Sequence, residues 1–274
     1  MKVSFFGTRG SCPTPGKDTI KYGGNTACVL VEANDGRKII LDAGTGIRVL
    51  GDELIKTNDD IYLLISHNHY DHIQGFPFFK PVYQKGRNIN IYPSVTEPNQ
   101  PEAVVEQMRG SYSPICSETL VSNIMFQTSL WSESPIDING FQVSRKPINH
   151  PNGGMAFLIS CDDKTVAYVT DNEINSPTQL TNKAQWLSFL ENIDLLIHDG
   201  QYIEDDLPLK LGWGHSLVSE SLNLAIEANV KNLAIYSHDP ERTDAQLDQL
   251  QNEIDTIKSN VNAFLSREGQ SITL

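Results

Sequence analysis

Short apolar runs recur along the chain and are separated by segments rich in Gly, Pro, Asn and Asp. Runs of this kind, bounded by turn residues, are typical of buried β-strands. The predicted strands are Lys2–Phe6, Ala27–Glu32, Lys38–Leu41, Ile61–Ile65, Phe141–Lys146, Met155–Ser160, Thr165–Val169, Leu195–Ile197 and Leu233–Tyr236. Segments of helical composition predict helices at Ile47–Lys56, Gln100–Arg109, Ala184–Glu191, Leu217–Ala228 and Thr243–Ser259. Strands followed by helices in both halves of the chain predict an α/β protein.

Residues 111–135 give a poorer pattern, because Ser and Pro are interspersed among the apolar residues. We expect this segment to form a lid or a dimer surface, and the protein to be a homodimer. No linker or short-period repeat divides the chain, and 274 residues can bury a substantial core. Residues 1–274 are therefore predicted to form a single domain.

The predicted strand Ile61–Ile65 runs directly into a segment with four potential metal ligands, His67-Asn68-His69-Tyr70-Asp71-His72. Because side chains of an extended chain alternate with a period of two, His67 and His69 project to the same side. If the chain turns after the strand, Asp71 and His72 face a second point nearby. Imidazole and carboxylate ligands together suit zinc, manganese or iron. The segment predicts one metal ion and favours a second.

Four other predicted strands are followed by metal-type or acid–base side chains. These residues are Thr170 and Asp171, His198 and Asp199, Ser237 and His238, and His150. In α/β proteins the functional residues usually lie beyond the carboxyl ends of the strands, where the loops converge. Six of the seven histidines lie at such ends, and the seventh, His215, lies in Gly212-Trp213-Gly214-His215-Ser216. We therefore expect these residues to form one site.

The sequence resembles the metallo-β-lactamase-fold hydrolases, and within them the branch that includes ribonuclease Z and class II cyclic-nucleotide phosphodiesterases. The resemblance covers essentially the whole chain. It is carried by the histidine cluster, by the Gly-His-Ser segment, and by Phe6–Ser11, Tyr22–Thr26 and Leu41–Gly46. It implies a four-layer αββα sandwich, in which two sheets pack face to face with helices outside.

The resemblance also implies a centre of two divalent metal ions, with zinc the first choice and manganese or iron as alternatives. His67, His69 and His150 would hold the first ion; Asp71, His72 and His238 would hold the second; Asp171 would bridge them. Taken alone, a histidine such as His150 is more often a loop residue, and an aspartate such as Asp171 is more often a helix N-cap. Asp42 either fixes the orientation of the histidines or forms a simple turn.

The resemblance makes Asp199 and His215 catalytic candidates, together with Asp71. In ribonuclease Z a Glu–His pair lies at the matching positions, outside the ligands. Asp199 would orient the imidazole and raise its pKa, and His215 would donate a proton to the leaving oxygen. The family's His-Glu-Ala-Thr is here His198-Asp199-Gly200-Gln201, which weakens the assignment to ribonuclease Z and keeps the carboxylate–histidine pair. The alternatives are that His215 caps the following helix and that His198 is structural.

The amino-acid composition limits the kinds of substrate and partner that we expect. Lys and Arg number 21 against 34 Asp and Glu, giving a net charge of −13. This acidity opposes a grip on long nucleic acid, but a small anionic substrate can still bind at metal ions. No apolar stretch approaches the length of a membrane span, and the start resembles no signal peptide, so we expect a cytoplasmic protein without a membrane partner. Four scattered cysteines predict no disulfide framework, and Cys12 is only a minor candidate ligand.

We interpret the chain as a dinuclear-metal phosphodiesterase for small phosphodiesters, such as cyclic nucleotides or short nucleotides. Bacterial ribonuclease Z carries a long Gly- and basic-rich arm that grips transfer RNA, and no such insert is visible here. Three alternatives stay open: a ribonuclease Z-like RNA 3′-processing endonuclease, a thioester or lactam hydrolase, and a non-hydrolytic metal-binding sensor. The candidate bridge Asp171 opposes the lactamase type, and the pair of Asp199 and His215 opposes the sensor.

Overall fold

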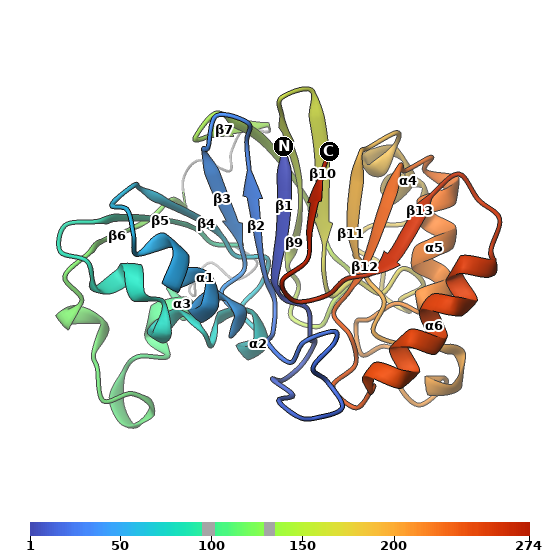
Figure 1. Ribbon diagram of the computed structural model, residues 1–274, viewed down its shortest axis with the longest axis horizontal. Coiled ribbons are helices and arrows are strands. Elements are labelled where there is room, and N and C mark those ends of the chain that lie inside the picture. The colour runs from blue at the N-terminus through green and yellow to red at the C-terminus, as the bar shows by residue number, and fades with distance from the viewer. Residues whose placement is uncertain (95–101, 129–134) are drawn as a thin grey trace.

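Two mixed β-sheets form the centre of the protein (Figure 1). The computed structural model describes residues 1–94, 102–128 and 135–274, and within these ranges each sheet has seven strands. The first sheet has the order β14-β1-β2-β3-β4-β5-β6 and the second β13-β12-β11-β10-β9-β8-β7. The first contains β1 (Lys2–Gly7), β2 (Cys28–Glu32), β3 (Lys38–Leu41), β4 (Ile61–Leu64), β5 (Asn88–Tyr92), β6 (Asn123–Phe126) and β14 (Ser271–Thr273). The second contains β7 (Ile136–Ile138), β8 (Phe141–Pro147), β9 (Met155–Cys161), β10 (Lys164–Val169), β11 (Leu195–Asp199), β12 (Asn232–Tyr236) and β13 (Asn262–Leu265).

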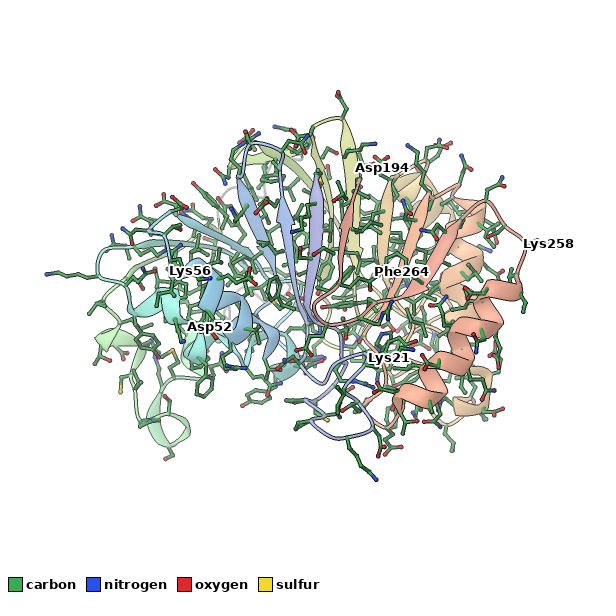
Figure 2. All side chains as sticks on the ribbon, viewed as in Figure 1. Lys21, Asp52, Lys56, Asp194, Lys258 and Phe264 are labelled. Atoms are coloured by element: carbon green, nitrogen blue, oxygen red, sulfur yellow. The ribbon has the colours of Figure 1, made fainter. Side chains whose placement is uncertain are left out.

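Helices cover the outer face of each sheet (Figure 1). The first sheet carries α1 (Gly46–Leu54), α2 (Tyr70–Ile73) and α3 (Ala103–Glu106), and the second carries α4 (Lys183–Leu190), α5 (Val218–Glu227) and α6 (Asp244–Thr256). None of the described helices is long and apolar enough to cross a membrane. Charged side chains such as Asp52, Lys56 and Lys258 lie on the outside of this assembly (Figure 2).

Three clusters of buried apolar side chains fill the space between the layers. The cluster between the sheets contains Phe5 and Val29 of the first sheet and Phe157 and Tyr168 of the second. A second cluster joins the first sheet to α1 and α3, and a third joins the second sheet to α4, α5 and α6. Since both faces of each sheet are covered, its central strands read as continuous apolar runs. The predicted αββα sandwich is confirmed.

Parallel strands bring one edge of both sheets together. β3, β4 and β5 run parallel in the first sheet, as do β10, β11 and β12 in the second. Their carboxyl ends therefore point to the same edge, and the loops that follow them meet there. Gly10 N donates to His238 O and Met155 N to Ser66 O, which ties the two sheets together at this edge.

All nine predicted strands are present within one or two residues at each end, but five strands were not predicted. These are β5, β6, β7, β13 and β14. The predicted helix Gln100–Arg109 contains α3, and its first two residues lie outside the described ranges. Residues 111–135 contain β6, and the lid or dimer role expected for them includes residues 129–134, which also lie outside the described ranges.

Candidate metal centre

Three histidines form the first group of candidate ligands. His67 and His69 follow β4, and His150 follows β8 on the opposite sheet. One ring nitrogen from each lies within 4.8 Å of the others. His69 Nδ1 is 3.0 Å from His150 Nε2, a distance at which two imidazoles can face a common cation. The expected first metal position is thus brought together by loops from both sheets.

Asp171 lies at the centre of the histidine cluster. Its Oδ2 is 3.1 Å from His72 Nε2, 3.6 Å from His67 Nε2 and 3.9 Å from His150 Nε2. One carboxylate oxygen therefore lies close to three imidazoles, which is the central position expected of the proposed bridging ligand. Asp71, at the start of α2, places its Oδ2 3.3 Å from His72 Nε2 and accepts a hydrogen bond from Ser11 N. This second group matches three of the four residues expected around the second ion.

The chemistry of the cluster suits divalent cations. His67 Nε2 is buried and has no hydrogen-bond partner among the described residues. Burial lowers the pKa of His67 well below its usual value and that of His150 to about 4, so both rings are neutral and offer a lone pair. Three buried carboxylates, Asp42, Asp71 and Asp171, surround His72. Bound cations would offset this concentration of negative charge, and these residues fit a pair of metal ions.

Asp42 holds His72 from behind. Its Oδ2 lies 2.7 Å from His72 Nδ1 and also accepts hydrogen bonds from Ser66 Oγ and Tyr168 OH. These contacts direct His72 Nε2 toward Asp71 and Asp171. The expected orienting position of Asp42 is therefore observed, while Ser66 and Tyr168 were missed because a hydroxyl group within or just after an apolar strand gives no sequence signal.

We predict that Asp42→Asn lowers the affinity for a divalent metal about 10–100-fold, because the amide oxygen is a weaker partner for the His72 N–H. Metal titration with a chromophoric competitor measures this change. Asp163→Asn is a matched control, since Asp163 is exposed and shares the positive φ of Asp42, 57° against 60°. Equal affinity of the Asp42 variant and the control would show that Asp42 is only a turn residue.

His215 forms a pair with Asp199 beside the cluster. His215 Nδ1 lies 2.7 Å from Asp199 Oδ2, and that carboxylate is fixed by hydrogen bonds from the backbone N–H groups of Asn172 and Gln201. Burial acts to lower the pKa of His215, but the carboxylates of Asp199 and Asp171 outweigh it and raise the pKa. His215 also falls in a ligand-type group with His150 and Asp171. It is not the cap of α5, since Glu220 Oε2 accepts the hydrogen bond from Leu217 N at that helix start.

Glu173, which sequence reasoning missed, holds the segment that carries His215. Its two carboxylate oxygens accept hydrogen bonds from Gly212 N and Gly214 N. Gly214 O in turn lies 2.9 Å from His150 Nδ1. The only signal in the sequence was that Glu173 follows closely after Asp171.

Two further predicted residues lie outside the cluster, and Cys12 takes no part in any ligand group within the described ranges. His198 is fully buried and bonds through Nδ1 to Asp199 O and Ser221 Oγ, in agreement with its structural alternative. His238, expected to hold the second ion, is not brought to the site. Its Nε2 donates to Ser266 O at 2.8 Å, and its ring packs edge-on against Tyr22. The reason is that Ser237, with φ 59°, turns the chain so that the serine side chain faces Asp171 instead.

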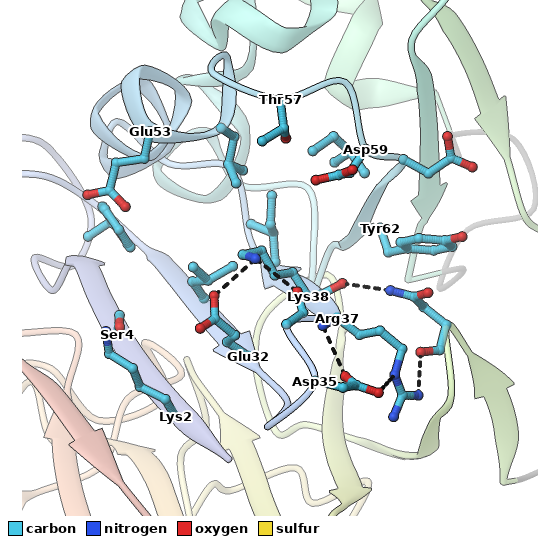
Figure 3. Close-up of a pocket in the computed structure, with 18 of the residues that line it drawn as sticks. Lys2, Ser4, Glu32, Asp35, Arg37, Lys38, Glu53, Thr57, Asp59 and Tyr62 are labelled. Atoms are coloured by element: carbon cyan, nitrogen blue, oxygen red, sulfur yellow. Dashed lines mark hydrogen bonds and ion pairs between the residues drawn. The ribbon is translucent and has the colours of Figure 1, made fainter.

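The cluster opens into a pocket of about 570 Å³. Its lining includes His69, Asp71, His150 and His215, with the exposed rings of Tyr70 and Trp213 at the rim. Another pocket, of about 620 Å³, lies over β1, β2 and β3 (Figure 3). That pocket is lined by charged pairs such as Lys38 with Glu32, and none of the candidate ligands lines it. The pocket that contains the candidate ligands is therefore the one at the carboxyl ends of the strands.

Comparison with known proteins places this arrangement in a family. Residues 37–238 match the beta-lactamase superfamily domain. Comparison with curated protein sequences gave no match. Among solved structures, the metallo-beta-lactamase fold protein YhfI from Bacillus subtilis superposes with a TM-score of 0.71 at 19% identity, covering 99% of this chain and 98% of that one.

Two other structures are similar over their whole length. A diphosphatase of the PhnP family has a TM-score of 0.70 at 16% identity, covering 100% of this chain and 97% of the other. The short form of human tRNase Z has a TM-score of 0.65 at 16% identity, covering 100% and 99%. The superpositions show a shared fold despite the low identities, and the family match spans most of the sequence. The chain therefore belongs to the beta-lactamase superfamily of metallo-β-lactamase-fold hydrolases, whose dinuclear metal site its His/Asp cluster fits.

Proposed function

We propose that the protein is a metal-dependent phosphodiesterase that hydrolyses small phosphodiesters, such as cyclic nucleotides or short nucleotides. The observation that carries this proposal is the pair of Asp199 and His215 at the border of the metal cluster. The His215 ring lies 5.2 Å from the His150 ring, centroid to centroid, and it lines the same pocket. A proton donor beside the cations is what the departure of an alkoxide requires.

Each member of this pair has a separate task in the proposed reaction. When bound, the two ions polarise the phosphodiester and lower the pKa of water. His215, through the ring nitrogen that is free of Asp199, donates a proton to the leaving oxygen. Asp199 fixes the tautomer of the ring and favours its protonated form, since the carboxylate lies against Nδ1. Zinc is our first choice of metal, with manganese or iron as alternatives, because imidazole and carboxylate accept all three.

The size and charge of the site favour a small substrate. A pocket of about 570 Å³ is in the range that encloses a nucleotide-sized ligand. The net charge of −13 disfavours long nucleic acid, because few cations are available to replace the counterions of its phosphates. The names of two similar structures, a diphosphatase and a tRNase, support phosphorus chemistry in general.

We expect metal-loaded protein to cleave bis(p-nitrophenyl) phosphate and at least one cyclic mono- or dinucleotide, and to process precursor transfer RNA poorly. The test is a parallel assay of these substrates at physiological salt, with protein stripped by a chelator as the control. Activity limited to a thioester or lactam would refute the phosphodiesterase proposal. Efficient cleavage of transfer RNA would favour the ribonuclease Z-like alternative and refute the preference for small substrates.

A further inference from the structure

The candidate ligands divide unevenly between the two metal positions. The first position has three imidazoles, those of His67, His69 and His150. The second position has His72 and Asp71, together with a share in Asp171. The end of β12 adjoins Asp171, so the side chain that points inward there decides whether the second position has a further strong ligand. The question is therefore which side chain faces the cluster from that strand end.

The side chain that faces it is a serine. Ser237 Oγ lies 3.3 Å from Asp171 Oδ1 and 3.2 Å from Gln201 Oε1. Gln201 Nε2 continues to Ser11 Oγ, and Ser11 N donates to Asp71 Oδ2. A chain of neutral groups thus runs from Asp171 to Asp71 along this side of the second position. A hydroxyl and an amide are much poorer ligands for zinc, manganese or iron than an imidazole, a thiolate or a carboxylate.

The neighbouring histidine cannot take the place of this serine. His238 is buried on the other side of the chain, where its Nε2 donates to Ser266 O. Its Nδ1 makes no hydrogen bond, but no ligand-type group among the described residues includes it. A rotation that brought His238 to Asp171 would break the Ser266 bond and remove the ring from Tyr22.

We propose that the two metal positions are unequal in affinity, and that Ser237 is the residue that sets the difference. The position at His67, His69 and His150 retains its ion, whereas the position at Asp71 and His72 loses its ion readily to solution. This inference rests on the metal centre of the proposed function. It is tested by metal binding alone, so the absence of phosphodiesterase activity would refute the function and leave the inference standing.

The first test measures the ions that the wild-type chain retains. Protein saturated with zinc and then dialysed against metal-free buffer should keep about one ion per chain, and calorimetric titration should resolve a tight and a weak step. Retention of two ions, with a single titration step, would overturn the proposal. This measurement needs no variant, so it decides the matter even where a substitution prevents folding.

The second test places a strong ligand at position 237. Ser237→Cys is the preferred change, since a Cβ added to Gly10 would lie 2.5 Å from Ser237 Oγ and little space remains there for a larger side chain. The cysteine variant should retain about two ions after the same dialysis, because a thiolate binds zinc far more tightly than a hydroxyl does. Loaded with cobalt(II), it should gain a sulfur-to-metal charge-transfer absorption that the wild type, despite its four cysteines, lacks.

Ser237→Ala is the matched control, because it removes the hydroxyl without supplying a ligand. It should retain the same single ion as the wild type and show no new absorption. If Ser237→Cys folds but retains one ion and shows no charge-transfer band, position 237 does not face the second ion and the proposal is wrong. If Ser237→Ala loses metal as completely as a chelator does, the hydroxyl is itself a required ligand, which also contradicts the proposal.

Discussion

Replacing Asp171 by Ala should abolish hydrolysis and lower the metal content below that of the wild type. Among the described residues, its Oδ2 is the one carboxylate oxygen that lies within 4 Å of the Nε2 atoms of His67, His72 and His150. Its removal leaves the imidazoles without the charge that offsets two dications. A bound metal contributes several kcal/mol to stabilising the transition state, so we expect a loss of about 10³-fold or more in kcat. Metal analysis and a bis(p-nitrophenyl) phosphate assay measure the two effects.

Asp163→Ala is the matched control for this substitution. Asp163 is an exposed aspartate at φ 57°, and Asp171 has φ 50°, so both variants place alanine in the same unfavourable backbone region. Only the Asp171 variant should lose metal and activity. Asp171→Asn, which keeps the shape but not the charge, should also lose most activity. If Asp171→Ala kept the metal content and the turnover of the wild type, Asp171 would not be the bridging ligand.

Much of the fold was predictable because apolar runs of β2, β3, β4, β10 and β12 are buried on both faces. The strands that were missed have weaker signals. β6 and β14 are partly exposed, and β5 alternates Asn with Ile, so it contains no continuous apolar run. The histidine cluster was predictable because it adjoins a clear apolar strand.

The directions in which the side chains of residues 237 and 238 point could not be predicted in the same way. Along β12, Ala234 and Tyr236 face the core between the sheets, while Leu233 and Ile235 face the helices. The alternation then breaks at Ser237, whose φ of 59° is uncommon for a residue other than glycine. A left-handed residue redirects the chain, and the sequence gives no indication of it here. The resemblance to the family therefore implied His238 as a metal ligand, whereas the side chain that faces Asp171 is that of Ser237.

The last prediction separates proton transfer from metal binding at His215. His215→Ala should leave the metal content nearly unchanged, because its Nδ1 is already engaged by Asp199 and the six other candidate ligands that the structure gathers remain. With a poor leaving group, such as a ribose alkoxide, turnover should fall about 10²–10⁴-fold, since the leaving oxygen must be protonated as it departs. With p-nitrophenolate, which leaves without a proton, the loss should be much smaller.

Asp199→Asn tests the same mechanism through the partner of the histidine. The amide still positions the ring but no longer favours its protonated form, because the carboxylate that raises the pKa of His215 is gone. We therefore expect a weaker version of the same dependence on the leaving group, again with metal retained. Both variants are compared with the wild type on both substrates at one pH. If His215→Ala depletes the metal, His215 is a ligand, as its grouping with His150 and Asp171 also permits. If the variant slows the reactions of both leaving groups equally, the ring has only a structural role. Either result would show that His215 is not the proton donor.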